Sequence, residues 1–198
     1  MKNILVLGAA GQIGSELVPY LRKIYGGPNV VATYRRTPLI PEIMEGGPCE
    51  NMDALEAEKM FEVVKRYNID TIINLVAVLS AVGENKPTLA WKINMDSMIN
   101  SLEVAKEMGA AVFLPSSIGA FGLSTPMDNT PQDTLMRPTT IYGISKVAAE
   151  LLGDYYHVKY GVDTRGLRYP GIISNVTLPG GGTTDYAVEI YYEAIKNK

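Results

Sequence analysis

Short apolar runs alternate with longer amphipathic segments along almost the whole chain. The runs are of the continuous kind that forms strands buried on both faces of a sheet, and they lie at 2–7, 30–34, 71–78, 111–116 and 163–169, with a shorter one near Cys49. Helical patterns occupy the segments between and after them, at 15–25, 53–67, 87–108, 139–160 and 184–196. This alternation predicts an α/β fold with a doubly wound parallel sheet and helices on both faces.

Capping signals place the ends of two of these helices. Residues 53–56 read Asp-Ala-Leu-Glu, a capping-box pattern that would open a helix at Asp53. Gly161 follows the helix 139–160 in the way that a C-terminal glycine does. The 198 residues contain neither an internal repeat nor a low-complexity linker, and they suffice for one well-buried α/β domain. We therefore expect residues 1–198 to form a single domain.

Composition and charge exclude several classes of function. The net charge is −3 and the largest basic cluster is Arg35-Arg36, which argues against a nucleic-acid partner. No apolar stretch approaches the ~20 residues of a membrane span, and the N-terminus lacks a signal-peptide layout. Cys49 is the single cysteine and His157 the single histidine, so we expect no metal site and no Ser-His-Asp catalysis. A lone cysteine fits a reducing compartment, and we expect a cytoplasmic protein.

The segment directly after the first predicted strand contains three regularly spaced glycines. Gly8, Gly11 and Gly14 form a G-x-x-G-x-x-G loop between that strand and the helix that starts near Ser15. Such glycines permit a tight turn, a close approach of backbone N–H groups to a pyrophosphate, and close packing of helix on strand. The helix N-terminus adds partial positive charge. The loop predicts a dinucleotide site in a Rossmann-type domain, at the carboxyl ends of strands, where Ser80 and Ser117 are also expected.

Tyr142 and Lys146 are four residues apart on a predicted helix, so they share one face of it. An ammonium beside a phenol favours the phenolate and lowers its pKa from about 10, which would make Tyr142 a usable base. Ser116 and Ser117 end the preceding strand and could hold the oxygen that Tyr142 deprotonates. The alternative is an ordinary pair on the helix surface, with Ser117 bonded to turn backbone. Only the combination with the glycine loop and with Ser116 and Ser117 at the end of a strand favours a proton-transfer site.

For several other polar residues, two different roles are compatible with the sequence. Asn94 would be unfavourable inside a helix unless its amide bonds to something specific, and it is either a functional or a structural residue. Asp53 either caps its helix or contacts a cofactor base. Thr183 and Thr184, after three glycines, either cap the last helix or belong to a loop that closes over substrate.

Together the glycine loop, the Asn94 segment, Ser117 and Tyr142-x-x-x-Lys146 resemble the extended short-chain dehydrogenase/reductase family. Three further segments are more specific: PSSIGAFG at 115–122, LRYPGIIS at 167–174 and GTTDYAV at 182–188. These segments resemble the L-threonine 3-dehydrogenases of that family, the group related to UDP-galactose 4-epimerase. The resemblance runs along essentially the whole chain.

The resemblance implies oxidation of the β-hydroxyl of L-threonine to 2-amino-3-oxobutyrate, with hydride passing to NAD. On this resemblance Tyr142 is the base, and Lys146 lowers the pKa of Tyr142 and holds the nicotinamide ribose. Ser117, with Ser116, positions the reacting oxygen, and Asn94 lies near these catalytic groups. For the cofactor the resemblance implies contacts with Gly8, Gly11, Gln12, Ile13, Gly14, Leu75, Ala77, Pro170 and Gly171. For the amino acid it implies Ser80, Thr183 and Thr184. It also implies a homodimer paired through the helices around 88–108 and 139–160.

Two features depart from the family pattern. An acidic residue usually ends the second strand of NAD-dependent members, whereas here Tyr34 stands in its place, followed by Arg35. An arginine there can accommodate a 2′-phosphate, so NADP stays an alternative to NAD, and Asp53 joins Arg35 as a candidate at the adenosine end. Family members also continue into a small lobe over the substrate, and we expect 175–198 to lead into a truncated or absent lobe. A nucleotide-sugar epimerase or reductase, or a catalytically impaired nucleotide-binding protein, remain the alternative functions.

Overall fold

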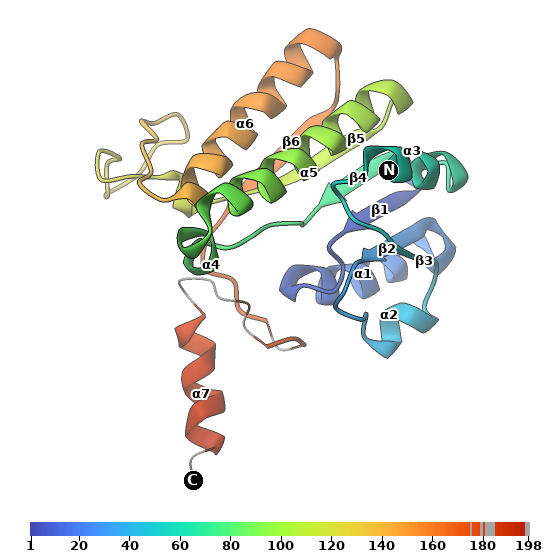
Figure 1. Ribbon diagram of the computed structural model, residues 1–198, viewed down its shortest axis with the longest axis horizontal. Coiled ribbons are helices and arrows are strands. Elements are labelled where there is room, and N and C mark those ends of the chain that lie inside the picture. Colours follow the sequence, from blue (N-terminus) through green and yellow to red (C-terminus); the bar gives the residue numbers. More distant parts are fainter. Residues whose placement is uncertain (175, 179, 181–184, 197–198) are drawn as a thin grey trace.

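The computed structural model describes residues 1–174, 176–178, 180 and 185–196, and its centre is one parallel sheet (Figure 1). Within these ranges the sheet has six strands in the order β3-β2-β1-β4-β5-β6. Their bounds are β1 Ile4–Leu7, β2 Val30–Tyr34, β3 Cys49–Asn51, β4 Thr71–Asn74, β5 Ala111–Ser117 and β6 Thr164–Tyr169. The order reverses between β1 and β4, which is where ligands bind to doubly wound sheets. The predicted Rossmann-type fold is confirmed.

Helices cover both faces of the sheet. On one face lie α1 and α2, and on the other lie α3, α5 and α6 (Figure 1). The helices of the described residues are α1 Gln12–Tyr25, α2 Pro41–Glu45, α3 Ala57–Arg66, α4 Ser80–Asn85, α5 Pro87–Met108, α6 Ile141–Tyr160 and α7 Tyr186–Lys196, with short 3₁₀ turns at Gly27–Asn29 and Ile118–Ala120. The short helices α2 and α4 were not predicted from the sequence.

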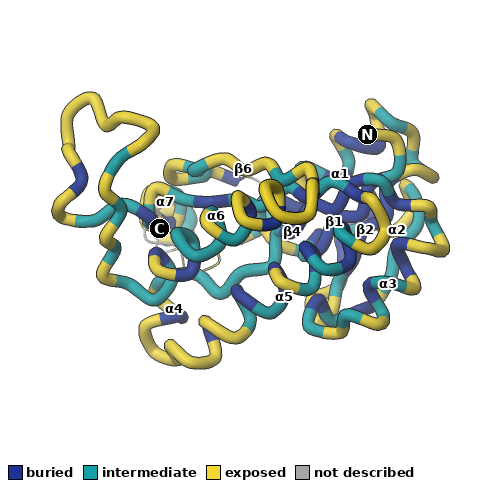
Figure 2. The backbone as a smooth tube through the Cα atoms, turned by 90° about the horizontal axis from the view of Figure 1, so that it is seen from above, coloured by how far each residue is buried: buried dark blue, intermediate teal, exposed yellow. Residues whose placement is uncertain are grey.

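The alternation of side chains along β1 creates two cores. Ile4 and Val6 point into the core beneath α1 and α2, whereas Leu5 and Leu7 point into the core beneath α3 and α5. All four are fully buried. Figure 2 shows that burial is densest around β1, β2 and β4, while the loop between Ala120 and Ile141 is largely exposed. Burial on both faces explains why these strands read as continuous apolar runs.

The predicted capping box at Asp53 is wrong. Helix α3 begins four residues later, at Ala57, with Glu56 in the N-cap position. The carboxylate of Asp53 instead accepts a hydrogen bond from the backbone N–H of Leu55 at 3.1 Å and one from the guanidinium of Arg35 at 2.6 Å. A side chain that bonds two residues ahead closes a local turn, and this turn replaces the first turn of the predicted helix.

The predicted strand 71–78 is also too long, because β4 ends at Asn74. The side chain of Asn74 accepts a hydrogen bond from the backbone N–H of Val76 at 3.0 Å, and the amide of Asn94 bonds both backbone groups of Val78. These side chains satisfy backbone groups that a strand would have paired. Ser80 consequently starts α4 and does not end a strand as expected.

Helix α7 extends away from the sheet, and every residue from Tyr186 to Lys196 is at least partly exposed (Figure 1). Among the described helices, none combines the length and the apolar character needed to cross a membrane.

Candidate active site

A cavity of about 160 Å³ opens beside the carboxyl ends of β4, β5 and β6 and the N-terminus of α1. The sequence-predicted residues that line it are Gln12, Ile13, Leu75, Ala77, Ser80, Ser116, Ser117, Tyr142, Lys146 and Pro170. Its wall also includes residues that the sequence analysis missed, namely Asn74, Leu79, Pro115, Tyr169, Ile172 and Asp185. Tyr169 is the last residue of its strand both in the structure and in the prediction, so its position in a parallel sheet was the signal that could have identified it. Asn74 also ends its strand, but the strand predicted at 71–78 was too long to mark it.

The glycine loop forms one border of this cavity. Gly8 follows β1 with a φ of +78°, a conformation that favours glycine, and a Cβ there would meet the backbone of Leu75 and Val76 at 3.3 Å. Gly14 lies still closer to its neighbours, because a Cβ there would be 2.6 Å from the Cα of Ala9. Two of the three predicted glycines are therefore required by the protein's own packing.

Gly11 is different from the other two. Its φ of −82° is open to any residue, and the nearest heavy atom to a Cβ would be the carbonyl oxygen of Gly8, at an ordinary 3.5 Å. Gly11 occupies the N-cap of α1, next to the first backbone N–H groups of the helix. A side chain here would occupy space outside the loop, where a ligand could approach those N–H groups.

Tyr142 meets Ser117 at the cavity. Tyr142 lies in the first turn of α6, while Ser117 is the last residue of β5 and accepts a hydrogen bond from the backbone N–H of Gly119 at 3.0 Å. Burial raises the pKa of Tyr142, and a hydrogen bond with Ser117 opposes that rise. Gly119 allows this approach, because a Cβ there would lie 3.3 Å from the Tyr142 ring and 3.4 Å from the Ser117 hydroxyl.

Lys146 lies one helical turn further along α6, with its Nζ 5.3 Å from the centre of the Tyr142 ring. The ammonium donates a hydrogen bond to the carbonyl oxygen of Pro115 at 2.6 Å. Burial lowers the pKa of Lys146 to about 8, and the charge of Glu150 opposes that change. The expected lowering of the Tyr142 pKa is wrong for this arrangement, since desolvation of the phenol outweighs the other influences on it.

Asn94 bonds to the backbone rather than entering the cavity. Its side-chain oxygen accepts a hydrogen bond from the N–H of Val78 at 2.7 Å, and its amide donates to the Val78 carbonyl and to the Ser145 hydroxyl, each at 3.2 Å. Ser145 in turn donates to the carbonyl oxygen of Tyr142 at 2.7 Å. Asn94 thus ties the segment after β4 to the helix that carries Tyr142 and Lys146, which explains an asparagine inside α5.

Ser116 lies in the wall of the cavity, but its hydroxyl donates a hydrogen bond to the carboxylate of Glu150. Successive residues of a strand point to opposite faces, so the side chain of Ser116 leaves β5 in a different direction from that of Ser117. The Ser116 hydroxyl thus has a partner within the protein, and its expected role beside Ser117 in holding a reacting oxygen stays a prediction.

Arg35 and Asp53, the two polar candidates for the adenosine end, lie outside this cavity. Arg35 follows β2, and its guanidinium forms an ion pair of 2.6 Å with Asp53 on a partly exposed surface. The amide of Asn51 donates a hydrogen bond to the carbonyl oxygen of Arg35 at 2.9 Å. Thr183 and Thr184, the two other substrate candidates, fall outside the described residues.

Comparisons with known proteins agree with this architecture. An uncharacterized epimerase/dehydratase of Staphylococcus aureus (strain MRSA252) is 52% identical over 196 residues, which are 99% of this chain and 61% of that protein. The solved structure of an L-threonine dehydrogenase from Clostridium difficile is 57% identical, with a TM-score of 0.94 over 100% of this chain and 62% of its own. A GalE-like L-threonine dehydrogenase from Cupriavidus necator, in its holo form, is 47% identical, with a TM-score of 0.92 over 99% of this chain and 63% of its own.

The resemblance to the L-threonine dehydrogenases related to epimerases is thereby confirmed, and the chain spans about three fifths of the length of these relatives. A model of the NAD dependent epimerase/dehydratase family matches residues 4–189. This match includes the glycine loop, the whole sheet and the Tyr142–Lys146 pair. The chain belongs to the NAD dependent epimerase/dehydratase family.

Proposed function

We propose that this chain forms the nucleotide-binding and catalytic part of an NAD-dependent L-threonine 3-dehydrogenase. The observation that carries the proposal is the convergence of Tyr142, Ser117 and Lys146 on one cavity that reaches the N-terminus of α1. The similarity to two solved threonine dehydrogenases supports the choice of substrate. On this proposal residues 1–198 act as one domain, as the sequence predicted.

The residues present fit a dinucleotide. Neither packing nor backbone conformation requires a glycine at position 11, so its missing side chain leaves room for a phosphate beside the helix N-terminus. Gln12 and Ile13 lie next to it at the edge of the cavity, and Leu75, Ala77 and Pro170 provide further wall. Gly8 and Gly14 keep the loop in the shape that exposes these groups.

The bound nicotinamide would supply the acceptor for a hydride. Tyr142, as phenolate, would take the proton of the threonine β-hydroxyl. Ser117, fixed by the N–H of Gly119, would hold that hydroxyl in reach. The positive charge of Lys146 would stabilise the phenolate and bond the cofactor ribose. Ser80 is the described residue that we assign to the amino-acid head group, and the role assigned to Thr183 and Thr184 stays a prediction.

The ion pair of Arg35 with Asp53 favours NAD over NADP in this proposal. An arginine at the end of the second strand can bind a 2′-phosphate, but Asp53 already neutralises this one at 2.6 Å. A carboxylate at this position would also repel a phosphate and can accept hydrogen bonds from ribose or base.

Initial-rate assays test the function directly. L-threonine is supplied with NAD and, in parallel, with NADP, and nicotinamide reduction is followed by absorbance. We expect turnover with L-threonine and a preference for NAD. Epimerisation of UDP-galactose without oxidation of L-threonine would support the epimerase alternative and overturn our proposal. Cofactor binding without oxidation of any alcohol would indicate a nucleotide-binding protein that has lost catalysis.

The dependence of kcat/KM on pH should have a recognisable form. The active state needs Tyr142 deprotonated and Lys146 protonated, whereas the pKa of Tyr142 is raised and that of Lys146 is lowered to about 8. The active fraction therefore rises about tenfold per pH unit until Lys146 starts to deprotonate near pH 8, and it is level above that until Tyr142 titrates. Rates of L-threonine oxidation between pH 6 and 10 check this, and a plateau that already begins below pH 7 would contradict it.

We also propose that the protein pairs into a homodimer through α5 and α6, which pack side by side at the surface (Figure 1). Several large apolar side chains of these helices are exposed, among them Trp91, Leu151 and Val158. Light scattering after size-exclusion chromatography is expected to give twice the mass of the chain, 21.6 kDa. Val158→Lys should shift the protein to the monomer, and a monomeric unsubstituted chain at micromolar concentration would contradict the proposal.

A further inference from the structure

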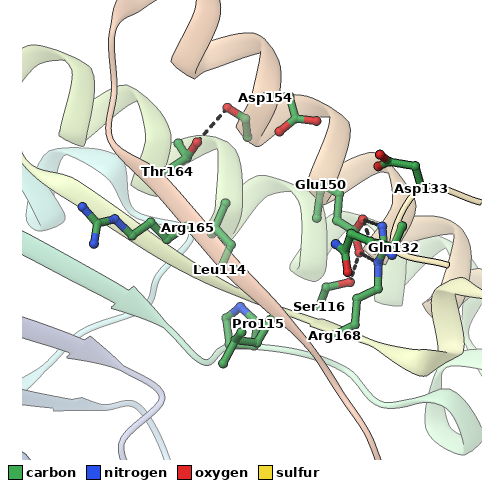
Figure 3. A pocket seen from close by; sticks show the side chains of 14 residues that line it. Leu114, Pro115, Ser116, Gln132, Asp133, Glu150, Asp154, Thr164, Arg165 and Arg168 are labelled. Carbon is green, nitrogen blue, oxygen red and sulfur yellow. Dashed lines mark hydrogen bonds and ion pairs between the residues drawn. The ribbon is translucent and has the colours of Figure 1, made fainter.

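Glu150 lies two helical turns beyond Tyr142 and one beyond Lys146, on the same face of α6. Figure 3 shows its carboxylate directed at Ser116 and Arg168, which come from β5 and β6. The hydroxyl of Ser116 donates a hydrogen bond to the carboxylate of Glu150. The Nε of Arg168 donates to both carboxylate oxygens at 3.0 and 3.2 Å, and its Nη2 donates to Oε2 at 2.7 Å. Side chains from two strands, β5 and β6, thus hold the carboxylate of Glu150 in a single orientation.

Arg168 is itself fixed. Its Nη1 donates to the backbone carbonyl of Gln132 at 2.7 Å, and its guanidinium lies 5.5 Å from the centre of the Phe121 ring. The side chain of Arg168 is 17% exposed and that of Glu150 is 22% exposed, so the pair is mostly shielded from water. A second cavity, of about 310 Å³, is lined by this pair together with Asp133 and Asp154 (Figure 3). Ser116 and Pro115 line both cavities and separate the pair from the candidate active site.

Glu150 is the acidic residue whose charge acts on Lys146. The ammonium of Lys146 bonds to Pro115, the residue next to Ser116 on β5. The titratable groups around Lys146 come from three places. Helix α6 contributes Tyr142 and Glu150, β6 contributes Arg168 and Tyr169, and Asp185 lines the candidate active site. The charges of two cations act on Glu150: Lys146, one helical turn before it on α6, and Arg168 on β6, which forms an ion pair with it.

We propose that Glu150 is a positioning residue which, held by Ser116 and Arg168, supplies the negative charge that keeps Lys146 protonated beside Tyr142. Glu150 acts through Lys146 and does not touch the reacting atoms. The effect of Glu150 on catalysis rests on the proposed function, whereas the effect of Glu150 on the protonation of Lys146 does not depend on any substrate or cofactor. Arg168 limits this effect, because it competes with Lys146 for the same carboxylate.

Competitive labelling with acetic anhydride tests the proposal without substrate or cofactor. The rate of acetylation of Lys146, read by mass spectrometry of its peptide at a series of pH values, gives its titration curve. Removing the carboxylate in Glu150→Gln should lower the Lys146 pKa by about one unit, since an anion no longer stabilises the ammonium. Arg168→Gln should raise it, because the whole charge of Glu150 then acts on Lys146. Glu103→Gln is the matched control, as Glu103 also bonds a lysine and a tyrosine, but away from the cavity.

Opposite shifts in the two variants, with no shift in the control, support the proposal. An unchanged Lys146 titration in folded Glu150→Gln would overturn it, and if that variant fails to fold, Arg168→Gln decides alone. In the pH profile of L-threonine oxidation the start of the plateau should move down by the same amount in Glu150→Gln. A labelling shift in a protein that does not oxidise L-threonine would uphold the role of Glu150 and reject the proposed function.

Discussion

Replacing Tyr142 with phenylalanine is expected to lower kcat for L-threonine oxidation by about 1,000-fold, the contribution of a positioned general base. The ring packs against Gly119 in either variant, so the substitution removes only the hydroxyl that meets Ser117. Affinity for NAD should change by less than about tenfold, the value of one neutral hydrogen bond. Stopped assays at saturating substrate give kcat, and calorimetric titration gives the cofactor affinity.

The same helix offers a matched control for this variant. Tyr155 and Lys159 repeat the spacing of Tyr142 and Lys146, and the ammonium of Lys159 donates to the Tyr155 hydroxyl at 2.7 Å. This second pair lies on an exposed surface, 46% of Tyr155 being accessible, and outside the candidate active site. Tyr155→Phe should leave kcat unchanged. If Tyr142→Phe retains the activity of the unsubstituted protein, Tyr142 has no part in proton transfer.

These two pairs also show how far the sequence could locate the site. A tyrosine four residues before a lysine occurs twice on α6, and spacing alone cannot say which pair faces a cavity. The choice of Tyr142 depended on Ser117 and the glycine loop, whose strands bring them to the same edge of the sheet. Positions fixed by the order of strands were therefore predictable, since the carboxyl ends of parallel strands meet at one edge.

The contacts of individual side chains were not predictable in the same way. Glu150 and Arg168 are separated by 18 positions on different elements, and no periodic pattern connects them. The errors at Asp53 and in the segment after Asn74 share one cause, because polar side chains there bond the backbone and replace regular structure. Apolar periodicity reports burial, and it carries no information on such bonds.

Alanine at Gly14 and alanine at Gly11 should differ in their effect on the stability of the fold, although the sequence motif treats the two positions alike. In Gly14→Ala the new Cβ would lie 2.6 Å from the Cα of Ala9 and 2.7 Å from the carbonyl oxygens of Ala9 and Gly8. Backbone atoms cannot rotate away, so α1 must move from the loop at a cost of about 1–3 kcal/mol. We expect a melting temperature lower by several degrees and a strongly weakened affinity for NAD.

Gly11→Ala separates the binding of cofactor from the stability of the fold. The backbone at Gly11 suits alanine, and the nearest contact of 3.5 Å is ordinary, so stability should change by less than about 0.5 kcal/mol. The methyl group would nonetheless lie where a phosphate must approach the N–H groups of α1, and NAD affinity should fall by about tenfold or more. Thermal unfolding followed by circular dichroism, with and without NAD, measures both effects in both variants. Unchanged NAD binding in Gly11→Ala would place the pyrophosphate elsewhere, because only a ligand, and no part of the loop's own packing, explains the missing side chain at that position.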